Sequence, residues 1–278
     1  MEAPKQKIIY HHTHSPKKYT FRMIDRYLAK GWYRMYQDLF TTTHNLYEED
    51  KETMNRVWWL RYGIDNLTPH ESHKKILKRA KSFEITIKRF IDNSCEEHDL
   101  YGLYRRNIDF DGYDSLNKCL YGGDKVNSKY NTHIIRIKDK GELIGVGLFD
   151  KGFNSLSSEI HFFHPSYKKY SIGKLLILLT IDFMRKNKMK WYYTGYIVVG
   201  RPKLDYKLFL GKDSAEYFDY ETKSWLPYKD DILEEEHYTS YDLNVMHISM
   251  AFTKSKEFDV RELMDQIEND LKSIEANN

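Results

Sequence analysis

A strand, a long apolar helix and a second strand follow one another directly in this chain, and this run constrains the fold more than any other feature. The strands are expected at 159–164 and 191–198, and the helix at about 172–187, with Leu175 and Leu179 on its apolar side. Two strands joined through a helix pair in parallel within one sheet. Such a pair can splay at its ends and admit a ligand.

Other elements are expected on both sides of this unit. Thr68 and Glu71 form a capping box with Pro69 at the first helical position, which predicts a helix there, and Ser94 with Glu97 predicts another. Further helices are expected before Gly31, at 202–209 and from about 259; strands are expected at 32–40, 57–64, 83–90, 133–137 and 143–150, a hairpin at 217–227 and a strand at 245–252.

This order predicts an α+β fold with one mixed sheet flanked by helices. The polar segment 41–55 is expected to be a connection. It suggests a small N-terminal subdomain at 1–52, a main domain at 53–230 and a C-terminal strand and helix extension at 231–278.

The composition is that of a folded protein rather than a disordered or fibrous one. The 278 residues are 41% hydrophobic, with 15% aromatic and 31% charged residues. No run approaches the roughly 18 apolar residues that a membrane span needs, and no apolar segment follows the first seven residues. We therefore expect a cytoplasmic protein that does not bind membranes.

Metal-binding patterns are weak. The only cysteines, Cys95 and Cys119, cannot supply a disulfide framework or a four-thiolate site, and we expect both to be reduced and structural. The group His11, His12 and His14 has no Cys or carboxylate nearby at ligand spacing, so a flexible N-terminal segment and no metal site are expected.

The charge balance hides an uneven distribution. The chain has 44 Lys and Arg against 41 Asp and Glu, which by itself argues against nucleic acid. Acidic residues gather at 48–52 and from 230 onwards, and one group of basic residues lies at 201–207. A second group is on the helix after Thr68 and consists of Lys74, Lys75, Lys78, Arg79 and Lys81. This helix is either a solvated basic face or a surface for a nucleic acid backbone.

Three segments resemble the arginyl- and leucyl-tRNA:protein transferases. The first is Gly-Val-Gly-Leu-Phe-Asp at 145–150 with Leu-Ser-Ser at 156–158 and Phe-Phe-His-Pro at 162–165. The second is Ser-Ile-Gly at 171–173. The third is Tyr-Thr-Gly-Tyr at 193–196 with Arg-Pro-Lys-Leu-Asp-Tyr-Lys at 201–207. The resemblance extends over about 20–230 and implies a GNAT-like acyltransferase fold.

The resemblance implies transfer of an arginyl or leucyl group from charged tRNA to the α-amine of a protein or peptide with an acidic N-terminal residue, as in an N-degron pathway. Aminoacyl-tRNA is then a co-substrate and no cofactor is expected. A free α-amine has a pKa of about 7.7–8.0, so demands on a general base are modest and the site should mainly position its substrates.

Residues in these segments are the candidates for the site. Asp150, Glu159 and Tyr196 are the candidate catalytic residues. The two carboxylates are expected at strand ends, where they either orient the amine, recognise a cationic aminoacyl group or have no special role. The candidate substrate-binding residues are Ser171 and Gly173 at a helix N-terminus that can bind an anion, and Arg201, Lys203, Tyr206 and Lys207 on a basic helical turn. The basic helix at 74–81 is the candidate tRNA-binding surface.

Departures from the family pattern keep two alternatives open. Arg201, Leu204 and His164 stand where the family has Cys, Met and usually Asp, and 41–44 is Thr-Thr-Thr-His near the place of the family's Cys-x-x-Cys-like cluster. A coenzyme A-dependent N-acetyltransferase is disfavoured because Tyr170 and Leu175 occupy the outer positions of the pyrophosphate signature. A non-catalytic homologue that binds tRNA or acidic N-termini is the other alternative.

Overall fold

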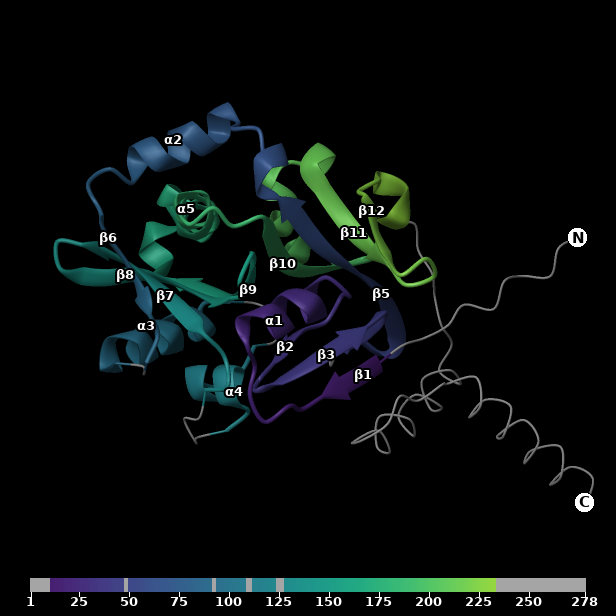
Figure 1. Ribbon diagram of the computed structural model, residues 1–278. Coiled ribbons are helices and arrows are strands. Elements are labelled where there is room, and N and C mark those ends of the chain that lie inside the picture. The colour runs from purple at the N-terminus through teal and green to yellow at the C-terminus, as the bar shows by residue number, and fades with distance from the viewer. Residues whose placement is uncertain (1–10, 48–49, 92–93, 109–111, 124–127, 234–278) are drawn as a thin grey trace, which may run out of the picture.

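The computed structural model describes residues 11–47, 50–91, 94–108, 112–123 and 128–233 (Figure 1). Its elements, in chain order, are β1 (His11–His14), α1 (Phe21–Leu28), β2 (Tyr33–Met35), β3 (Asp38–Thr42), β4 (His44–Tyr47), β5 (Asp50–Gly63), η1 (Ile64–Asn66), α2 (Glu71–Arg79), β6 (Glu84–Arg89), α3 (Cys95–Arg106), α4 (Leu116–Tyr121), β7 (Thr132–Asp139), β8 (Glu142–Lys151), β9 (Ser155–Phe163), η2 (Pro165–Tyr170), α5 (Ile172–Lys186), β10 (Trp191–Val198), η3 (Pro202–Leu210), η4 (Lys212–Ser214), β11 (Ala215–Asp219), β12 (Ser224–Pro227) and η5 (Asp230–Leu233). The η elements are 3₁₀ helices.

The strands of the described residues form a large mixed sheet and a small antiparallel one. The large sheet has the order β12-β11-β5-β10-β9-β8-β7-β6, with β4 paired to β5 outside this path, and the small sheet has the order β1-β3-β2. This confirms an α+β architecture with a mixed sheet flanked by helices.

The parallel crossover predicted from the sequence is present and determines where a ligand can enter. β9 and β10 pair in parallel only between Ser155–Ser157 and Trp191–Tyr193. Beyond this point β10 has an irregularity at Gly195, whose φ is +89°, and continues alongside β5. The two strands therefore diverge after three residue pairs, and Glu159 and Tyr196 lie past the last pair.

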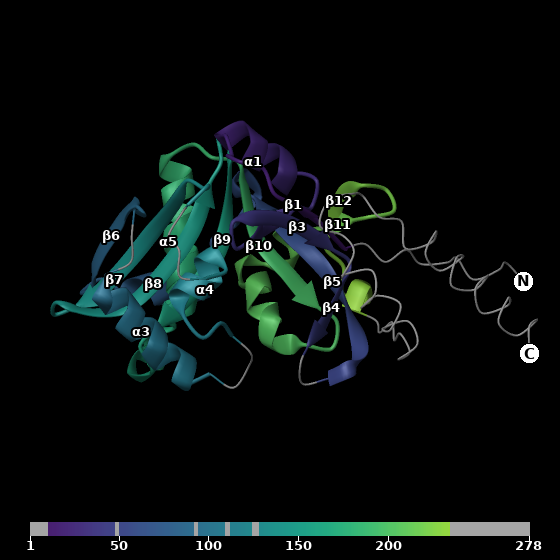
Figure 2. The same cartoon turned by 90° about the horizontal axis from the view of Figure 1, so that it is seen from below.

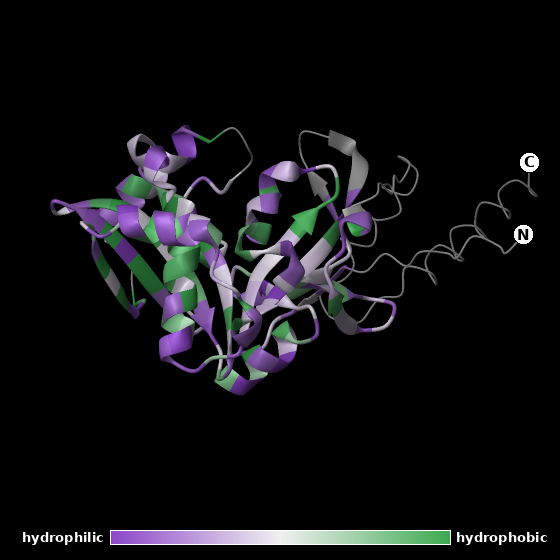
Figure 3. Ribbon diagram, turned by 90° about the horizontal axis from the view of Figure 1, so that it is seen from above, coloured by the Kyte–Doolittle hydropathy of each residue, from purple (hydrophilic) through white to green (hydrophobic). Residues whose placement is uncertain are grey.

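Helices cover both faces of the part of the sheet that contains β7 and β8. Alternate residues of β7 point to opposite faces: Ile135 and Ile137 pack in the cluster around α5, whereas Ile134 packs with α3 and α4. Figure 2 shows α3 and α4 on the near side of these strands and α5 behind them. The hydrophobic residues in Figure 3 accordingly concentrate on the inner strands and the helix that crosses them.

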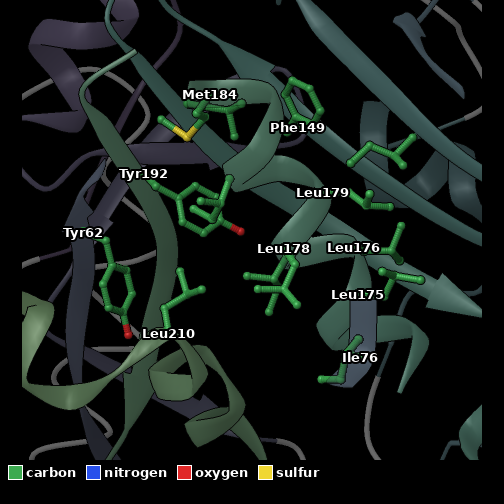
Figure 4. Close-up of a cluster of buried hydrophobic side chains, with 14 of the residues drawn as sticks. Tyr62, Ile76, Phe149, Leu175, Leu176, Leu178, Leu179, Met184, Tyr192 and Leu210 are labelled. Carbon is green, nitrogen blue, oxygen red and sulfur yellow. The ribbon is translucent and has the colours of Figure 1, made fainter. Parts of the chain in front are cut away.

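The largest cluster surrounds α5, the most apolar helix of the described chain. Its Leu175, Leu176 and Leu179 face Phe149 and α2, and Tyr62 and Tyr192 close the cluster on the other side (Figure 4). Burying a side chain such as Leu contributes about 1.5–3 kcal/mol, so this cluster fixes the position of the α5 N-terminus.

A third cluster joins the small sheet to the large one through aromatic rings. Tyr33 on β2 stacks on Trp59 of β5 with ring centroids 4.0 Å apart, and Tyr196 approaches the edge of Trp59 at 4.8 Å. The Tyr33 hydroxyl donates to the Leu60 carbonyl at 3.0 Å. The N-terminal segment is thus part of the main body and lies next to β10.

Several sequence predictions about the N-terminal segment are wrong. His11, His12 and His14 belong to β1, a strand that pairs with β3, rather than to a flexible segment. The expected strand 32–40 is a hairpin of β2 and β3 that turns at Tyr36, whose φ is +59°. The turn was not expected because no Gly, Asn or Asp occupies that position. The expected connection 41–55 contains the end of β3, β4 and the start of β5. Residue 52, the expected subdomain boundary, lies within β5.

Other differences concern helix ends and β9. The N-cap of α2 is His70 rather than Thr68, with His73 Nδ1 accepting from the His70 N–H at 3.4 Å. The strand expected at 159–164 begins at Ser155, so Glu159 lies in mid-strand. Helix α4 was not expected because its amphipathic pattern is only six residues long. The strand at 245–252, the helix from 259 and nearly all of 231–278 lie outside the described residues.

Candidate active site

The diverging ends of β9 and β10 border a cavity of about 640 Å³. Its wall comes from α3, β9, β10, the N-terminus of α5 and η3, together with residues around α4. The lining residues are Tyr101, Tyr104, Ile108, Gly112, Tyr113, Cys119, Glu159, Ile160, His161, Phe163, Lys168, Ser171, Gly173, Lys174, Tyr196, Arg201, Lys203, Leu204, Tyr206 and Lys207. We call this the large cavity.

The structure gathers the predicted site residues unevenly. Glu159, Tyr196 and all six candidate substrate-binding residues, Ser171, Gly173, Arg201, Lys203, Tyr206 and Lys207, line the large cavity. Asp150 lines neither this cavity nor the smaller one described below, because its side chain is buried in an ion pair. The five basic residues at 74–81, four on α2 and Lys81 just after it, do not line either cavity and are all exposed to solvent.

Positive charge dominates the rim of the large cavity. Lys168 and Lys174, which the sequence analysis did not select, join Arg201, Lys203 and Lys207 among the lining residues. The sequence feature that could have identified them is their position three residues before and three residues after Ser171. Glu159 is the only residue with a carboxyl group among the described lining residues. Such a rim attracts a polyanion.

Lys207 lines the large cavity next to the part of β10 that has diverged from β9. Its Nζ donates to the Tyr196 carbonyl at 2.5 Å and lies 5.1 Å from the centroid of the Tyr196 ring. Its own carbonyl accepts from the Tyr62 hydroxyl at 2.9 Å. Burial lowers the pKa of the Lys207 ammonium to about 8, because the charged form loses hydration there.

Tyrosine rings form the opposite wall. Tyr101, Tyr104 and Tyr113 come from the α3 region, and Tyr206 from η3. Sequence reasoning missed the first three because α3 is far from η3 in the chain. Partial desolvation of Tyr206, which is 45% exposed, raises the pKa of its hydroxyl, so the hydroxyl stays protonated and can donate or accept a hydrogen bond.

A second, smaller cavity of about 320 Å³ adjoins the first. It is lined by His11, Arg34, Met35, Tyr36, Phe40, Thr42, His44, Asn45, Leu120 and four residues that also line the large cavity, Tyr113, Cys119, Glu159 and Tyr196. Asn45 Nδ2 donates to the Tyr196 hydroxyl at 3.0 Å and so fixes that ring between the two spaces. We call this the small cavity and the four shared residues the junction.

Behind the junction lies a buried charge cluster. Arg34 Nη1 lies 3.1 Å from Asp150 Oδ2 and 3.2 Å from Oδ1, and Thr132 Oγ1 donates to Asp150 Oδ1 at 2.6 Å. Arg34 also donates to the Leu120 and Tyr36 carbonyls at 2.7 and 2.5 Å. Desolvation, followed by the charge of Asp150, raises the pKa of Glu159 to about 8.

The segment that stands near the family's cysteine cluster does not fit a thiolate-held metal or iron–sulfur group. Thr41–His44 is buried, and its groups bond to protein: Thr43 Oγ1 lies 2.8 Å from His44 Nδ1, and Thr42 Oγ1 donates to the His44 carbonyl at 2.6 Å. Neither cysteine is part of this segment, although Cys119 lines the small cavity together with Thr42 and His44. Among the residues that the structure describes, no three His, Cys, Asp or Glu side chains are grouped to hold a metal ion.

None of the helices in the described ranges has the length and apolar character needed to cross a bilayer.

The comparisons with known proteins agree with the motifs. The family model described as "Arginine-tRNA-protein transferase, C terminus" matches residues 80–213. The chain is 28% identical over 157 residues to an aspartate/glutamate leucyltransferase of Saccharophagus degradans, covering 53% of this chain and 63% of that one. It is 26% identical over 187 residues to that of Aeromonas hydrophila, covering 64% and 75%.

A further leucyltransferase, from Teredinibacter turnerae, is 30% identical over 152 residues, covering 53% of this chain and 61% of that one. The match spans less than two thirds of the S. degradans and T. turnerae relatives. Among solved structures, that of L-PGS from Bacillus licheniformis aligns with a TM-score of 0.41 and 11% identity over 55% of this chain and 51% of that one. On its family-model match and these relatives, the chain is similar to the aminoacyl-tRNA–protein transferases over a large part of its length.

Proposed function

We propose that this protein transfers an aminoacyl group from charged tRNA to the α-amine of a protein or peptide whose first residue is acidic. The observation that carries the proposal is the large cavity: it opens where β9 and β10 diverge, five cations surround it, and its core lies in the segment that matches the family model. No cofactor has a part in this proposal.

The large cavity suits the 3′ end of an aminoacyl-tRNA. Lys168, Lys174 and Arg201 offer cationic groups to phosphates, and the N-terminus of α5 at Ser171 and Gly173 adds N–H groups. The tyrosines of the opposite wall offer flat faces on which an unpaired base can stack, a contact worth about 1–3 kcal/mol per base. Aminoacyl-tRNA is therefore proposed as the donor.

The aminoacyl group is proposed to be leucyl rather than arginyl. A guanidinium would need an ionised carboxylate, and the one described carboxyl in the wall, Glu159, has a raised pKa and is largely neutral at pH 7. Ile160, Phe163 and Leu204 supply apolar wall instead. The three relatives named above are leucyltransferases acting on aspartate and glutamate by name.

The small cavity is proposed to take the acceptor N-terminus, since the amine and the ester must meet and the two cavities share only the junction residues among those described. Bringing the two groups into attack geometry can supply about 7–11 kcal/mol of the barrier reduction. We propose a GNAT-like fold for the main domain, supported by the β9-α5-β10 crossover and the divergence of its strands.

A donor panel tests this function. The protein is incubated with radiolabelled leucyl-, arginyl- and other aminoacyl-tRNAs, or with acetyl-CoA, and with peptides that begin with Asp, Glu or Ala. We expect label from leucyl-tRNA on the Asp and Glu peptides and none after the tRNA ester is hydrolysed beforehand. Transfer from acetyl-CoA alone would establish an acetyltransferase, and no transfer from any donor would favour a binding homologue.

A matched pair of variants connects that activity to the cavity. Lys203→Glu reverses a charge at the rim, whereas Lys188→Glu reverses an exposed charge beyond the C-terminal end of α5. We expect the first to raise KM for aminoacyl-tRNA about tenfold and the second to leave it unchanged, because loss and reversal of a phosphate contact costs a few tenths to a few kcal/mol. Equal effects would place the donor elsewhere.

A further inference from the structure

Among the described residues, Glu159 is the one with a carboxyl group that lines both cavities, and each cavity is proposed to hold one substrate. It lines the large and the small cavity, beside Tyr196, whose ring is held by Asn45 at 3.0 Å. Asp150 and Ser157 lie behind it and line neither cavity. A group at this junction can touch an amine that enters from one side and an ester that enters from the other.

The surroundings of Glu159 favour its acid form. Desolvation and then the charge of the neighbouring Asp150 both disfavour a second negative charge and raise the pKa of the Glu159 carboxyl. Asp150 faces Arg34 Nη1 at 3.1 Å and accepts from Thr132 at 2.6 Å, so Asp150 is the carboxylate. Ser157 Oγ donates to Glu159 Oε1 at 2.9 Å, which holds this oxygen in place.

The charged and titratable groups that face Glu159 are few and come from several elements. They are Asp150 on β8, Arg34 and Tyr33 on β2, Cys119 on α4, Tyr113 before α4 and Tyr196 on β10. His11 and His44 also line the small cavity. Burial raises the pKa of Cys119 to about 12, so the thiol adds no charge to the junction near neutral pH.

We propose that Glu159 is a catalytic proton relay for the proposed transfer, and that Arg34, Asp150 and Thr132 are positioning residues that keep its carboxyl in the acid form. As the amine nitrogen forms its bond to the ester carbonyl carbon, the proton that this nitrogen loses passes to one oxygen of the Glu159 carboxyl. The acid proton of Glu159 passes to the ribose oxygen of tRNA as the carbon–oxygen bond breaks.

This step balances without another reactant. The amine loses one proton, the leaving ribose oxygen gains one, and Glu159 ends as the same carboxylic acid with which it began. An ionised glutamate has only the proton that it takes from the amine to pass on, whereas the acid form can give one proton to the leaving oxygen while it takes the other from the amine. Asp150 and Thr132 line neither cavity and act through Glu159, and Arg34, which also lines the small cavity, acts on Glu159 through its ion pair with Asp150.

The relay rests on the proposed function, and Glu159→Gln tests it in the same assay. The amide keeps the size of the side chain but cannot relay a proton. We expect single-turnover transfer to an Asp peptide at saturating substrates to fall about 10²–10⁴-fold, with KM for the peptide nearly unchanged. Glu142→Gln, at an exposed glutamate outside both cavities, is the matched control and should keep the wild-type rate.

A pH profile separates a relay from a structural role. Activity that needs the Glu159 acid declines as pH rises through its pKa, which defines a basic limb. The charge of Asp150 raises that pKa and the Ser157 hydroxyl lowers it. Asp150→Asn should therefore move the basic limb to lower pH, and Ser157→Ala should move it to higher pH. A structural defect would lower the rate without moving the limb in opposite directions.

The outcomes distinguish the two proposals. Near wild-type transfer by Glu159→Gln, or a basic limb that Ser157→Ala leaves in place, overturns the relay while the transferase remains. A wild-type protein that transfers from no aminoacyl-tRNA overturns the proposed function and the relay with it. Infrared spectra give a readout independent of turnover: at pH 7 the wild type should show the carbonyl band of a buried carboxylic acid, and Glu159→Gln should lack it. An equal band in both proteins would also overturn the relay.

Discussion

Gly195 decides where β10 leaves β9. Its φ of +89° is a conformation that side chains with a Cβ rarely adopt, and a Cβ built at this residue would lie 3.4 Å from Lys207 Nζ. The same residue therefore creates the irregularity in β10 and leaves room for the ammonium that bonds to the Tyr196 carbonyl. The hydrogen bond between Lys207 and Tyr196 therefore joins the Tyr-Thr-Gly-Tyr segment at 193–196 to the Tyr-Lys pair at 206–207.

Gly195→Ala should cost stability and activity together. The strained φ is expected to lower the free energy of unfolding by about 1–3 kcal/mol, and a backbone shift that relieves this strain should move the neighbouring Tyr196 carbonyl, which holds Lys207 Nζ, and so reduce the transfer rate. Gly141→Ala is the control, since Gly141 has a φ of +86° with no atom within 4 Å of its Cβ position. Urea unfolding should show similar losses in both variants, but only Gly195→Ala should lower transfer. Equal transfer rates in Gly195→Ala and Gly141→Ala would mean that the position of Lys207 does not affect the reaction.

Lys207 should also make stability depend on pH. Its folded-state pKa of about 8 lies below the value near 10.4 of an unfolded lysine, so the unfolded chain binds more protons between these values. Stability should then rise with pH over that range, by at most about 1.4 kcal/mol per pH unit from this group. Urea unfolding of the wild type and Lys207→Met at several pH values from 7 to 10 measures the difference. Parallel curves would contradict the burial of this charge.

The departures from the family pattern have different consequences in the structure. His164 is the N-cap of η2, where its Nδ1 accepts from the Ser166 N–H at 3.2 Å, a bond that an Asp carboxylate can make equally well. His164 lines neither cavity. Arg201, in contrast, lines the large cavity and adds a guanidinium to its rim. The first change preserves a turn, and the second changes the site.

At the scale of elements, prediction succeeded where a pattern is long and periodic. Helix α5 and strand β10 were expected within about one residue of their observed bounds, because fifteen apolar-rich helical residues and an eight-residue strand leave few alternatives. The hairpin β2–β3 was missed since its turn at Tyr36 has no turn-forming residue. Its positive φ is imposed by tertiary packing, which the local sequence does not contain.

Helix α2 presents its basic face away from the core and connects to the site at one end. Its buried Ile76 packs on α5, while His73 lies 3.2 Å from the Phe209 carbonyl of η3, the element that supplies Lys203 and Lys207 to the large cavity. A tRNA with its 3′ end in the cavity would continue toward one of the surfaces around it. The position of α2 beside η3 makes it a candidate for that surface.

Charge reversal on α2 tests that surface. Lys74→Glu, Lys75→Glu and Lys78→Glu together should weaken tRNA binding and make the slope of log affinity against log salt shallower by up to about 2.7, about 0.9 per duplex phosphate contact. The control reverses Lys186, Lys188 and Lys190 around the far end of α5, which are exposed as well. Filter binding at several salt concentrations gives both slopes. Equal slopes in the two triple variants would mean that the basic residues of α2 face solvent and do not contact tRNA.

At the scale of the whole molecule, the site is assembled from segments that are distant in the chain. The family-like motifs at 145–207 led to Glu159, Tyr196, the α5 N-terminus and η3, which together line the large cavity. The tyrosine wall from α3, the thiol on α4 and Arg34 on β2 could not be predicted, because their place depends on how helices and the N-terminal hairpin pack on the sheet. Asp150 was expected at the cleft because of its strand-end position. Its side chain instead forms a buried ion pair with Arg34.

The Arg34–Asp150 pair joins the N-terminal hairpin to the large sheet. Both side chains are almost fully buried, at 3% and 2% exposure, and the guanidinium also bonds to the Leu120 carbonyl of α4 at 2.7 Å. Removing one partner leaves the other charge buried without compensation, which typically costs about 3–5 kcal/mol. Removing both leaves no such charge. The pair should therefore show strong coupling between the two sites.

A double-mutant cycle measures this coupling. Arg34→Met and Asp150→Leu should each lower the free energy of unfolding by about 3–5 kcal/mol, and the double variant should lose clearly less than the sum, because no uncompensated charge remains. Lys118 and Asp114, an exposed ion pair on α4 and the residues before it, provide the control cycle and should show little coupling. Additive losses at Arg34 and Asp150 would mean that the hairpin is held by the aromatic stack of Tyr33 on Trp59 rather than by this ion pair, since that contact is untouched in all three variants.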